Sequence, residues 1–195
     1  MNQRLRIAVA DDEADMRDFY CKILPRLGYE VVTVAETGSE LVDLCRSSQP
    51  DLIITDIKMP ELSGLDAARE IGRERPLPII LVSAYHDKEY IDCARCNHIL
   101  AYLLKPIKAV DLEPAIALAM QRFAEFQALH QQADDLRQAL EDRKLIERAK
   151  GILMKRGGLD EQVAFRNLQK LASDKNQKMV EIAKTILIAE EAFSS

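Results

Sequence analysis

The sequence lacks a long hydrophobic run, which limits the classes to which the protein can belong. Its most apolar stretch, residues 77–84, is far shorter than the ~20 residues needed to span a bilayer. The N-terminus turns acidic after a few apolar residues and shows no secretory leader or cleavage site. We therefore predict a protein without a membrane segment that stays in the cytoplasm.

Cysteine is also scarce, with four among 195 residues. Cys21, Cys45, Cys93 and Cys96 lie in apolar contexts without a disulfide framework, as expected of reduced thiols. Cys93 and Cys96 have CxxC spacing, but a structural zinc site needs four ligands and only His98 is a nearby additional candidate. We therefore interpret these two residues as helix thiols rather than as a metal or redox site.

An excess of basic charge is missing too, because 27 Lys and Arg residues face 32 Asp and Glu residues. The net charge of -5 argues against a nucleic-acid binder whose whole surface is basic. The deficit is confined to residues 1–124, which hold 15 basic and 20 acidic residues. Residues 143–178 hold ten basic and four acidic residues, so the total hides a basic segment.

The first 108 residues alternate short aliphatic or β-branched runs with helix-like stretches. Continuous apolar runs are typical of strands that are covered on both faces. Strands that alternate with helices predict an α/β fold with a parallel sheet between helices. The expected strands lie at residues 5–10, 30–34, 52–55, 78–83 and 100–104, and the expected helices at 13–27, 38–46, 64–73 and 90–96.

From residue 111 the pattern changes to one long helix that ends at Gly157 and Gly158. Asp160 then caps a second helix to about residue 172, and a turn at residues 173–176 leads to a third helix ending near residue 192. The long helix carries an apolar seam spaced like that of a coiled coil, and we favour dimerisation through it over a plain amphipathic helix. The seam consists of Phe126, Leu129, Ala133, Leu136 and Leu140.

Polar side chains follow four of the expected strands. Asp11 and Asp12 follow the first strand, Asp56 the third, Ser83 the fourth and Lys105 the fifth, so all meet at one edge of the sheet. Clustered carboxylates favour a hard cation such as Mg²⁺. With a lysine ammonium, they suit a site in which one carboxylate accepts a phosphoryl group. A single strand-end Asp is most often a cap, but five groups at four strand ends favour a functional site.

The stretches VADDE, DLIITDIKMPELSGLD, IILVSAY and AYLLKP resemble the receiver domain of two-component response regulators over about residues 4–125. The resemblance implies a flavodoxin-like five-stranded parallel sheet and a sensor histidine kinase as phosphodonor. It also implies no enzyme activity beyond slow self-dephosphorylation. Asp56 is then the phosphoacceptor, and Mg²⁺ is held by Asp11, Asp12, Asp56 and the backbone carbonyl of Lys58.

The same resemblance assigns roles to the last two strand ends. Ser83 hydrogen-bonds the phosphoryl group, Lys105 pairs with it, and Tyr102 matches the aromatic switch residue. The bond from Lys105 to Pro106 is expected to be cis.

The chain departs from the receiver pattern at two places. His98 and Ile99 replace the usual Gly-Ala before the fifth strand. Lys58 and Tyr85 occupy the two positions that tune dephosphorylation in the family, and a tyrosine there obstructs the attacking water. We therefore hypothesise a phosphoryl lifetime longer than seconds.

In the basic segment, Lys144, Arg148, Gly151 and Lys155 form one stripe along a helix. A glycine inside a helix costs ~1 kcal/mol relative to alanine, so we expect another helix or a phosphate backbone to approach Gly151 closely. By charge alone, nucleic-acid binding and an ordinary solvated face are equally good interpretations.

The sequence IERAKGILMKRGGLDEQVAFRNLQKLA resembles the ANTAR domain, an RNA-binding antitermination module, over about residues 134–191. We therefore expect a receiver at residues 1–125, a coiled-coil linker helix at 126–142 and a three-helix ANTAR bundle at 143–195. The implied partners are RNA hairpins, bound by a homodimer when the receiver is phosphorylated. Met154, Phe165 and Leu168 are predicted core residues, and no exposed aromatic is expected in the basic segment. The RNA-binding candidates are Lys144, Arg148, Ala149, Lys150, Gly151, Lys155, Arg156, Ala164 and Arg166.

Three other functions are alternatives to this interpretation. A DNA-binding output and a protein-binding output both remain open on the same receiver. A haloacid-dehalogenase-type phosphatase needs a second acid two residues after the nucleophile, where this chain has Lys58. The phosphatase is therefore disfavoured.

Overall fold

The computed structural model describes residues 4–84 and 99–194. The chain forms two compact units, residues 1–127 and residues 128–195, and helix α5 (Ala109–Gly157) contributes to both. Within the described ranges, no helix is long and apolar enough to cross a membrane.

The first unit is built on a parallel sheet of five strands in the order β2-β1-β3-β4-β5. This is the predicted flavodoxin-like architecture. The strands coincide closely with the five apolar runs of the sequence. They are β1 (Arg6–Ala10), β2 (Glu30–Ala35), β3 (Leu52–Asp56), β4 (Ile79–Ser83) and β5 (Ile99–Leu104).

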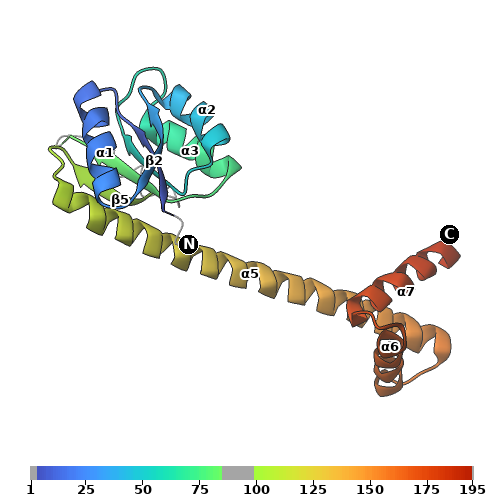
Figure 1. Cartoon of the computed structure of the whole chain (residues 1–195). Coiled ribbons are helices and arrows are strands. Elements are labelled where there is room, and N and C mark those ends of the chain that lie inside the picture. Colours follow the sequence, from blue (N-terminus) through green and yellow to red (C-terminus); the bar gives the residue numbers. More distant parts are fainter. Residues whose placement is uncertain (1–3, 85–98, 195) are drawn as a thin grey trace. The chain divides into compact units, whose positions relative to one another are not determined.

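Helices cover both faces of this sheet (Figure 1). Helices α2 (Gly38–Ser48) and α3 (Gly64–Glu74) pack on one face, whereas α1 (Ala14–Arg26) and the start of α5 pack on the other. All five residues of β3 and of β4 are buried, which explains why these runs are apolar without alternation.

Local signals define the ends of these helices. The side chains of Thr37 and Ser63 accept hydrogen bonds from the backbone N–H groups of Glu40 and Asp66, and so cap α2 and α3.

The predicted helix at residues 90–96 lies outside the described residues, as do Tyr85 and the cysteine pair of the CxxC motif. The two described cysteines are free thiols.

The second unit packs the C-terminal part of α5 against α6 (Glu161–Lys175) and α7 (Met179–Ser194). Its core contains Ala149, Leu168, Ile182 and Ala183. Asp160 caps α6 as predicted, since its side chain accepts a hydrogen bond from the Val163 N–H group. The predicted turn at residues 173–176 is wrong in extent. Helix α6 continues through Lys175, and only Asn176 adopts the left-handed conformation that ends it.

The apolar seam on α5 is exposed in the single chain. The exposed fractions of Leu129, Leu136 and Leu140 are 67%, 72% and 55%. At the start of the seam, Phe126 is half-buried and its ring stacks on that of Phe123. The exposed leucines are therefore available to a second helix.

Candidate functional site

Four carboxylates gather at the carboxyl edge of the sheet. Asp11 directly follows β1 and Asp56 ends β3, and both are buried, whereas Asp12 and Glu13 are exposed. One carboxylate oxygen from each lies within 4.8 Å of the others. The parallel sheet thus brings together residues that are far apart in the sequence, as predicted.

Lys105 from the end of β5 is the cation that faces this acid cluster. Its Nζ atom lies 2.6 Å from Asp56 Oδ2, 2.7 Å from Glu13 Oε1 and 3.2 Å from Asp11 Oδ2. Burial works to lower the pKa of Lys105, but hydrogen bonds to Asp56 and Glu13 outweigh it and raise the pKa above its ordinary value. The ammonium therefore stays charged.

The two carboxylate oxygens of Asp11 are engaged differently. Oδ1 accepts hydrogen bonds from the backbone N–H of Glu13 and from Lys105 Nζ, whereas the buried Oδ2 accepts none from the part of the chain that the structure describes and keeps an ionic contact with Lys105. Burial raises the pKa of Asp11 above its ordinary value, and the carboxylate of Asp56 adds to this effect. Carboxylate oxygens close together, one without a hydrogen bond, are a donor set that fits Mg²⁺.

Two residues that the sequence analysis did not single out shape this site. A Cβ atom on Gly64, at the start of α3, would lie 1.8 Å from the backbone oxygen of Asp56, so only glycine fits there. Arg17 Nη1 donates hydrogen bonds of 2.8 Å to the backbone oxygens of Asp11 and Asp12 and holds the acidic turn in place. The signal for Arg17 was a basic residue in the first turn of the helix that follows the acidic pair.

The remaining predicted receiver residues lie on the same edge or next to it. Ser83 is buried at the end of β4, and its hydroxyl donates to the carbonyl of the next residue. Tyr102 lies on β5 and is exposed. The bond from Lys105 to Pro106 is cis, which confirms that prediction. The backbone N–H of Lys58 lies 3.3 Å from Asp56 Oδ1.

In the second unit, the structure separates the nine RNA-binding candidates into two groups. Ala149 and Ala164 are fully buried between the helices, so these two candidates are not accessible to RNA in this conformation. Lys150 is also buried, and its Nζ lies 2.5 Å from Glu147 Oε2 and 2.7 Å from Glu161 Oε1. The other six are exposed: Lys144, Arg148, Gly151, Lys155, Arg156 and Arg166.

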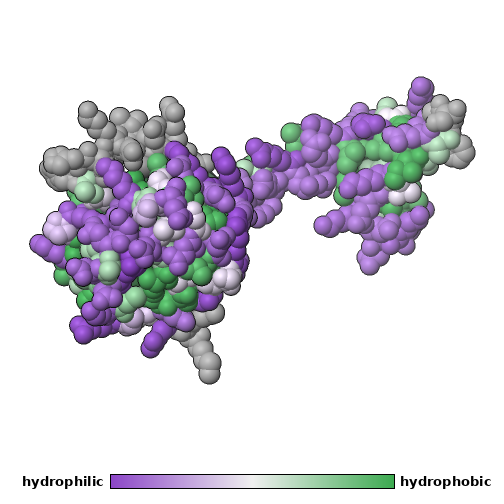
Figure 2. Space-filling view, turned by 90° about the horizontal axis from the view of Figure 1, so that it is seen from above, coloured by the Kyte–Doolittle hydropathy of each residue, from purple (hydrophilic) through white to green (hydrophobic). Residues whose placement is uncertain are grey.

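The predicted core residues of this unit are only partly confirmed. Leu168 is fully buried, whereas Met154 is half-buried. Phe165 is 37% exposed, so the expectation of no exposed aromatic in the basic segment is wrong. Hydrophobic surface lies among hydrophilic side chains in this unit (Figure 2).

A groove lies between α5 and α7 in the second unit. It has a volume of about 300 Å³. An ion pair of 2.5 Å between Arg156 Nε and Glu190 Oε2 links the two helices there. The groove is lined by Arg148, Gly151, Ile152, Lys155, Arg156, Leu187 and Glu190.

Comparison with known proteins decides the family. A model of the response regulator receiver domain matches residues 7–117, and a model of the ANTAR domain matches residues 134–187. The chain belongs to the response regulators that carry an ANTAR output domain.

Among curated relatives of this response regulator, the transcriptional regulatory protein PdtaR of Mycobacterium tuberculosis (strain ATCC 25618 / H37Rv) is 41% identical over 182 residues, covering 93% of this chain and 89% of PdtaR. The transcriptional regulatory protein HptR of Staphylococcus aureus (strain NCTC 8325 / PS 47) is 33% identical over 125 residues, or 63% of this chain and 49% of HptR. Among solved structures, a response regulator receiver domain protein from Clostridium thermocellum is 31% identical, with a TM-score of 0.56 over 64% of this chain and 98% of that one.

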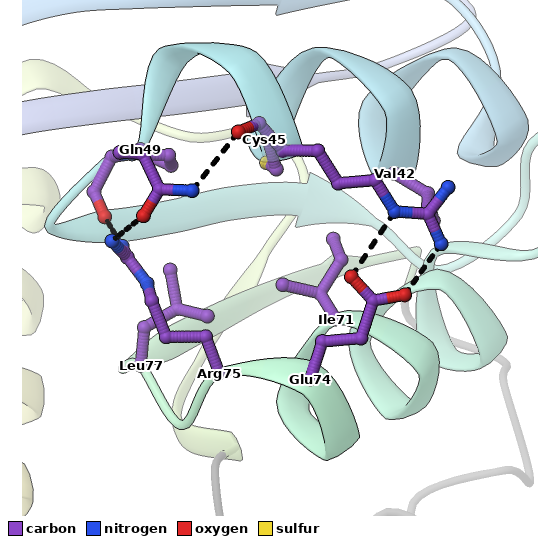
Figure 3. A pocket seen from close by; sticks show the side chains of 9 residues that line it. Val42, Cys45, Gln49, Ile71, Glu74, Arg75 and Leu77 are labelled. Carbon is purple, nitrogen blue, oxygen red and sulfur yellow. Dashed lines mark hydrogen bonds and ion pairs between the residues drawn. The ribbon is translucent and has the colours of Figure 1, made fainter.

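The receiver unit of this response regulator contains a cavity between α2 and α3 (Figure 3). Its arginines are already engaged: Arg46 forms ion pairs with Glu70 and Glu74, and Arg75 donates to Gln49. Burial raises the pKa of the Cys45 thiol that lines it to about 12, so the thiol is protonated and unreactive. We assign this cavity a structural role in joining the two helices.

Proposed function

We propose that this response regulator accepts a phosphoryl group on Asp56 from a sensor histidine kinase and thereby controls RNA binding by its ANTAR domain. The observation that carries the first part is the position of Lys105, whose ammonium contacts Asp56 at 2.6 Å within a cluster of three further acids. A carboxylate oxygen of Asp56 attacks the phosphorus of the kinase phosphohistidine, the N–P bond breaks, and the histidine nitrogen leaves with the electron pair. The protein is a phosphoacceptor rather than an enzyme.

In this proposal the residues that would hold Mg²⁺ are Asp11, Asp12, Asp56 and the backbone carbonyl of Lys58. Bound Mg²⁺ would neutralise charge on the transferred group. Arg17 keeps the acidic turn in position through the carbonyls that follow β1.

Phosphorylation adds negative charge to Asp56 and gives Lys105 a new partner. Ser83 supplies a hydroxyl from β4, and Tyr102 on β5 carries the change to the exposed face beside α5. Because α5 begins at Ala109, shortly after Lys105, and continues into the apolar seam, we propose that the change favours dimerisation through the seam.

The output we propose is the binding of RNA hairpins, with regulation of transcription termination. Six exposed candidates in a segment with an excess of basic residues support a nucleic-acid surface. A dimer presents two such modules, and linked binding to two hairpins raises the apparent affinity without new contacts. The relatives PdtaR and HptR are named as transcriptional regulatory proteins, which agrees with control of transcription.

The direct test measures affinity for RNA hairpins with and without acetyl phosphate, for the wild type and for Asp56→Ala. We expect acetyl phosphate to strengthen binding by the wild type and to leave Asp56→Ala unchanged. Equal wild-type affinities under both conditions would contradict the switch. Competition between hairpin RNA and duplex DNA tests the output, and a specific preference for the duplex would favour a DNA-binding function instead.

The hypothesis of a long phosphoryl lifetime rests on Tyr85, which lies outside the described residues. Loading with acetyl phosphate, followed by quenching with EDTA, measures that lifetime. A half-life of seconds would contradict the hypothesis.

A further inference from the structure

The groove between α5 and α7 carries two basic side chains that have no acidic partner among the described residues. Within the described part of the chain, Arg148 and Lys155 form no ion pair and no side-chain hydrogen bond, and both are exposed on its rim. By contrast, Lys144 is paired with Glu141 at 2.7 Å. Lys150 is likewise neutralised by two acids. Arg148 and Lys155 therefore contribute two uncompensated positive charges to the groove.

Gly151 keeps the floor of this groove open. A Cβ atom at this position would meet nothing within 4 Å, and the residue is exposed. The expected close approach of another helix to Gly151 is therefore wrong within the described chain. A glycine destabilises a helix interior relative to alanine, and no packing neighbour demands it here. What the glycine provides is an accessible surface of backbone.

The groove also contains groups that a surface for phosphates alone does not need. Ile152 and Leu187 give it apolar walls. The carboxylate of Glu190 repels phosphate, yet it lies beside three basic residues and is only partly exposed, with a side-chain exposure of 28%. A carboxylate next to a guanidinium offers hydrogen-bond acceptors and donors side by side, and the polar edge of a nucleobase presents the complementary pattern.

We propose that this groove binds one unpaired nucleotide from the loop of an RNA hairpin. The phosphates on either side contact Arg148 and Lys155, and the base lies over Gly151 against Ile152 and Leu187. The Arg156–Glu190 pair contacts the polar edge of the base and discriminates between bases. Unpaired loop bases are the usual targets of sequence-specific RNA recognition, because a paired base cannot enter such a groove. The inference rests on the proposed RNA-binding function and locates base selection within it.

The first experiment selects RNA hairpins with randomised loops on the full chain treated with acetyl phosphate and Mg²⁺. We compare the wild type with Glu190→Gln and with the matched control Glu191→Gln, which makes the same charge change at the next residue outside the groove. We expect the wild type to prefer one base at one loop position by about tenfold, the range of one good base contact. Glu190→Gln should lose that preference while keeping or gaining total RNA affinity, and the control should retain it.

The outcomes separate the two proposals. Base preferences that are identical in the wild type and Glu190→Gln would overturn the assignment of the groove and leave RNA binding intact. Failure of the wild type to bind any hairpin more tightly than duplex RNA would instead overturn the proposed function and the inference with it.

The second experiment fills the groove without disturbing the fold. Because a Cβ atom at Gly151 would meet nothing within 4 Å and leucine is a better helix former than glycine, Gly151→Leu should have a urea midpoint by circular dichroism no lower than that of the wild type. We expect its affinity for the selected hairpin to fall at least tenfold. Ala128→Leu, at another exposed position on α5, is the control and should bind as the wild type does. Wild-type affinity in a stable Gly151→Leu would contradict the proposal.

Discussion

Replacing Lys105 with methionine tests whether its ammonium stabilises the folded receiver unit by offsetting repulsion within the acid cluster. The substitution keeps an unbranched side chain and removes a charge that contacts Asp56 at 2.6 Å, Glu13 at 2.7 Å and Asp11 at 3.2 Å. Without it, two buried carboxylates and their exposed neighbours face one another with no compensating cation. We therefore expect the receiver unit to lose stability in the absence of Mg²⁺.

The magnitude follows from these distances. At an effective dielectric constant of about 20, charges 2.6 Å apart attract with roughly 6 kcal/mol and charges 3.2 Å apart with roughly 5 kcal/mol. Desolvation of the ammonium offsets much of this, and breaking a fully buried pair costs about 3–5 kcal/mol. Because the Lys105 side chain is 16% exposed, we expect a loss of about 2–4 kcal/mol in the free energy of unfolding.

Tyrosine fluorescence provides a signal for the receiver unit alone. The chain has no tryptophan, and its five tyrosines all lie before residue 103, within the first unit. Tyrosine fluorescence during urea denaturation therefore reports unfolding of the receiver. Lys108→Met is the matched control, because Lys108 is exposed and outside the acid cluster.

Adding Mg²⁺ gives the experiment a second arm. An ammonium and a divalent cation compete for the same carboxylates, so Mg²⁺ should stabilise Lys105→Met more than it stabilises the wild type. A variant as stable as the wild type without Mg²⁺ would show that the three contacts contribute nothing to folding. An equal gain with Mg²⁺ in both proteins would refute competition at the cluster.

Three further predictions concern the packing at Gly64, the apolar seam and the pH dependence of the Lys105 contribution. Gly64→Ala should destabilise the receiver by about 2–3 kcal/mol in the same assay, since its Cβ would lie 1.8 Å from the Asp56 oxygen; unchanged stability would contradict this packing. Leu136→Lys should weaken the dimer that we propose for the phosphorylated protein at least tenfold in sedimentation experiments, because it places a charge in the exposed seam; an unaffected dimer would exclude the seam. Because the folded-state pKa of Lys105 is raised, its contribution to stability is complete below about pH 10 and is lost as pH rises through the folded value. The urea midpoint of the wild type should therefore fall more steeply above that pH than that of Lys105→Met, and parallel curves would contradict the raised pKa.

The receiver site could be predicted almost entirely from the sequence. Five apolar runs alternating with helices leave few topologies, and a parallel sheet places the ends of its strands at one edge. Asp11, Asp56 and Lys105 follow such runs directly, so their meeting required no knowledge of packing. The missed residues act through the backbone. Gly64 is required because the backbone carbonyl of Asp56 leaves no room for a side chain, and Arg17 donates hydrogen bonds to two backbone carbonyls. A pattern of side chains in the sequence does not reveal contacts with the backbone.

The second unit shows where sequence patterns stop being sufficient. Helical periodicity placed Lys144, Arg148, Gly151 and Lys155 on one stripe, and the structure leaves that stripe exposed. Periodicity did not show that Lys150 is buried between Glu147 and Glu161, because Glu161 belongs to another helix. The same limit made Phe165 look like a core residue.

The sequence by itself determined that the protein combines an acid cluster at the ends of its strands with a basic helical segment, since both follow from the types of residue and their positions along the chain. The tertiary structure decided which members of that segment are accessible. Ala149, Gly151 and Ala164 are all small, yet the two alanines are buried and the glycine is open. The reason is physical. The period of a helix determines which residues share a face, whereas the positions of α6 and α7 determine which face of α5 is covered.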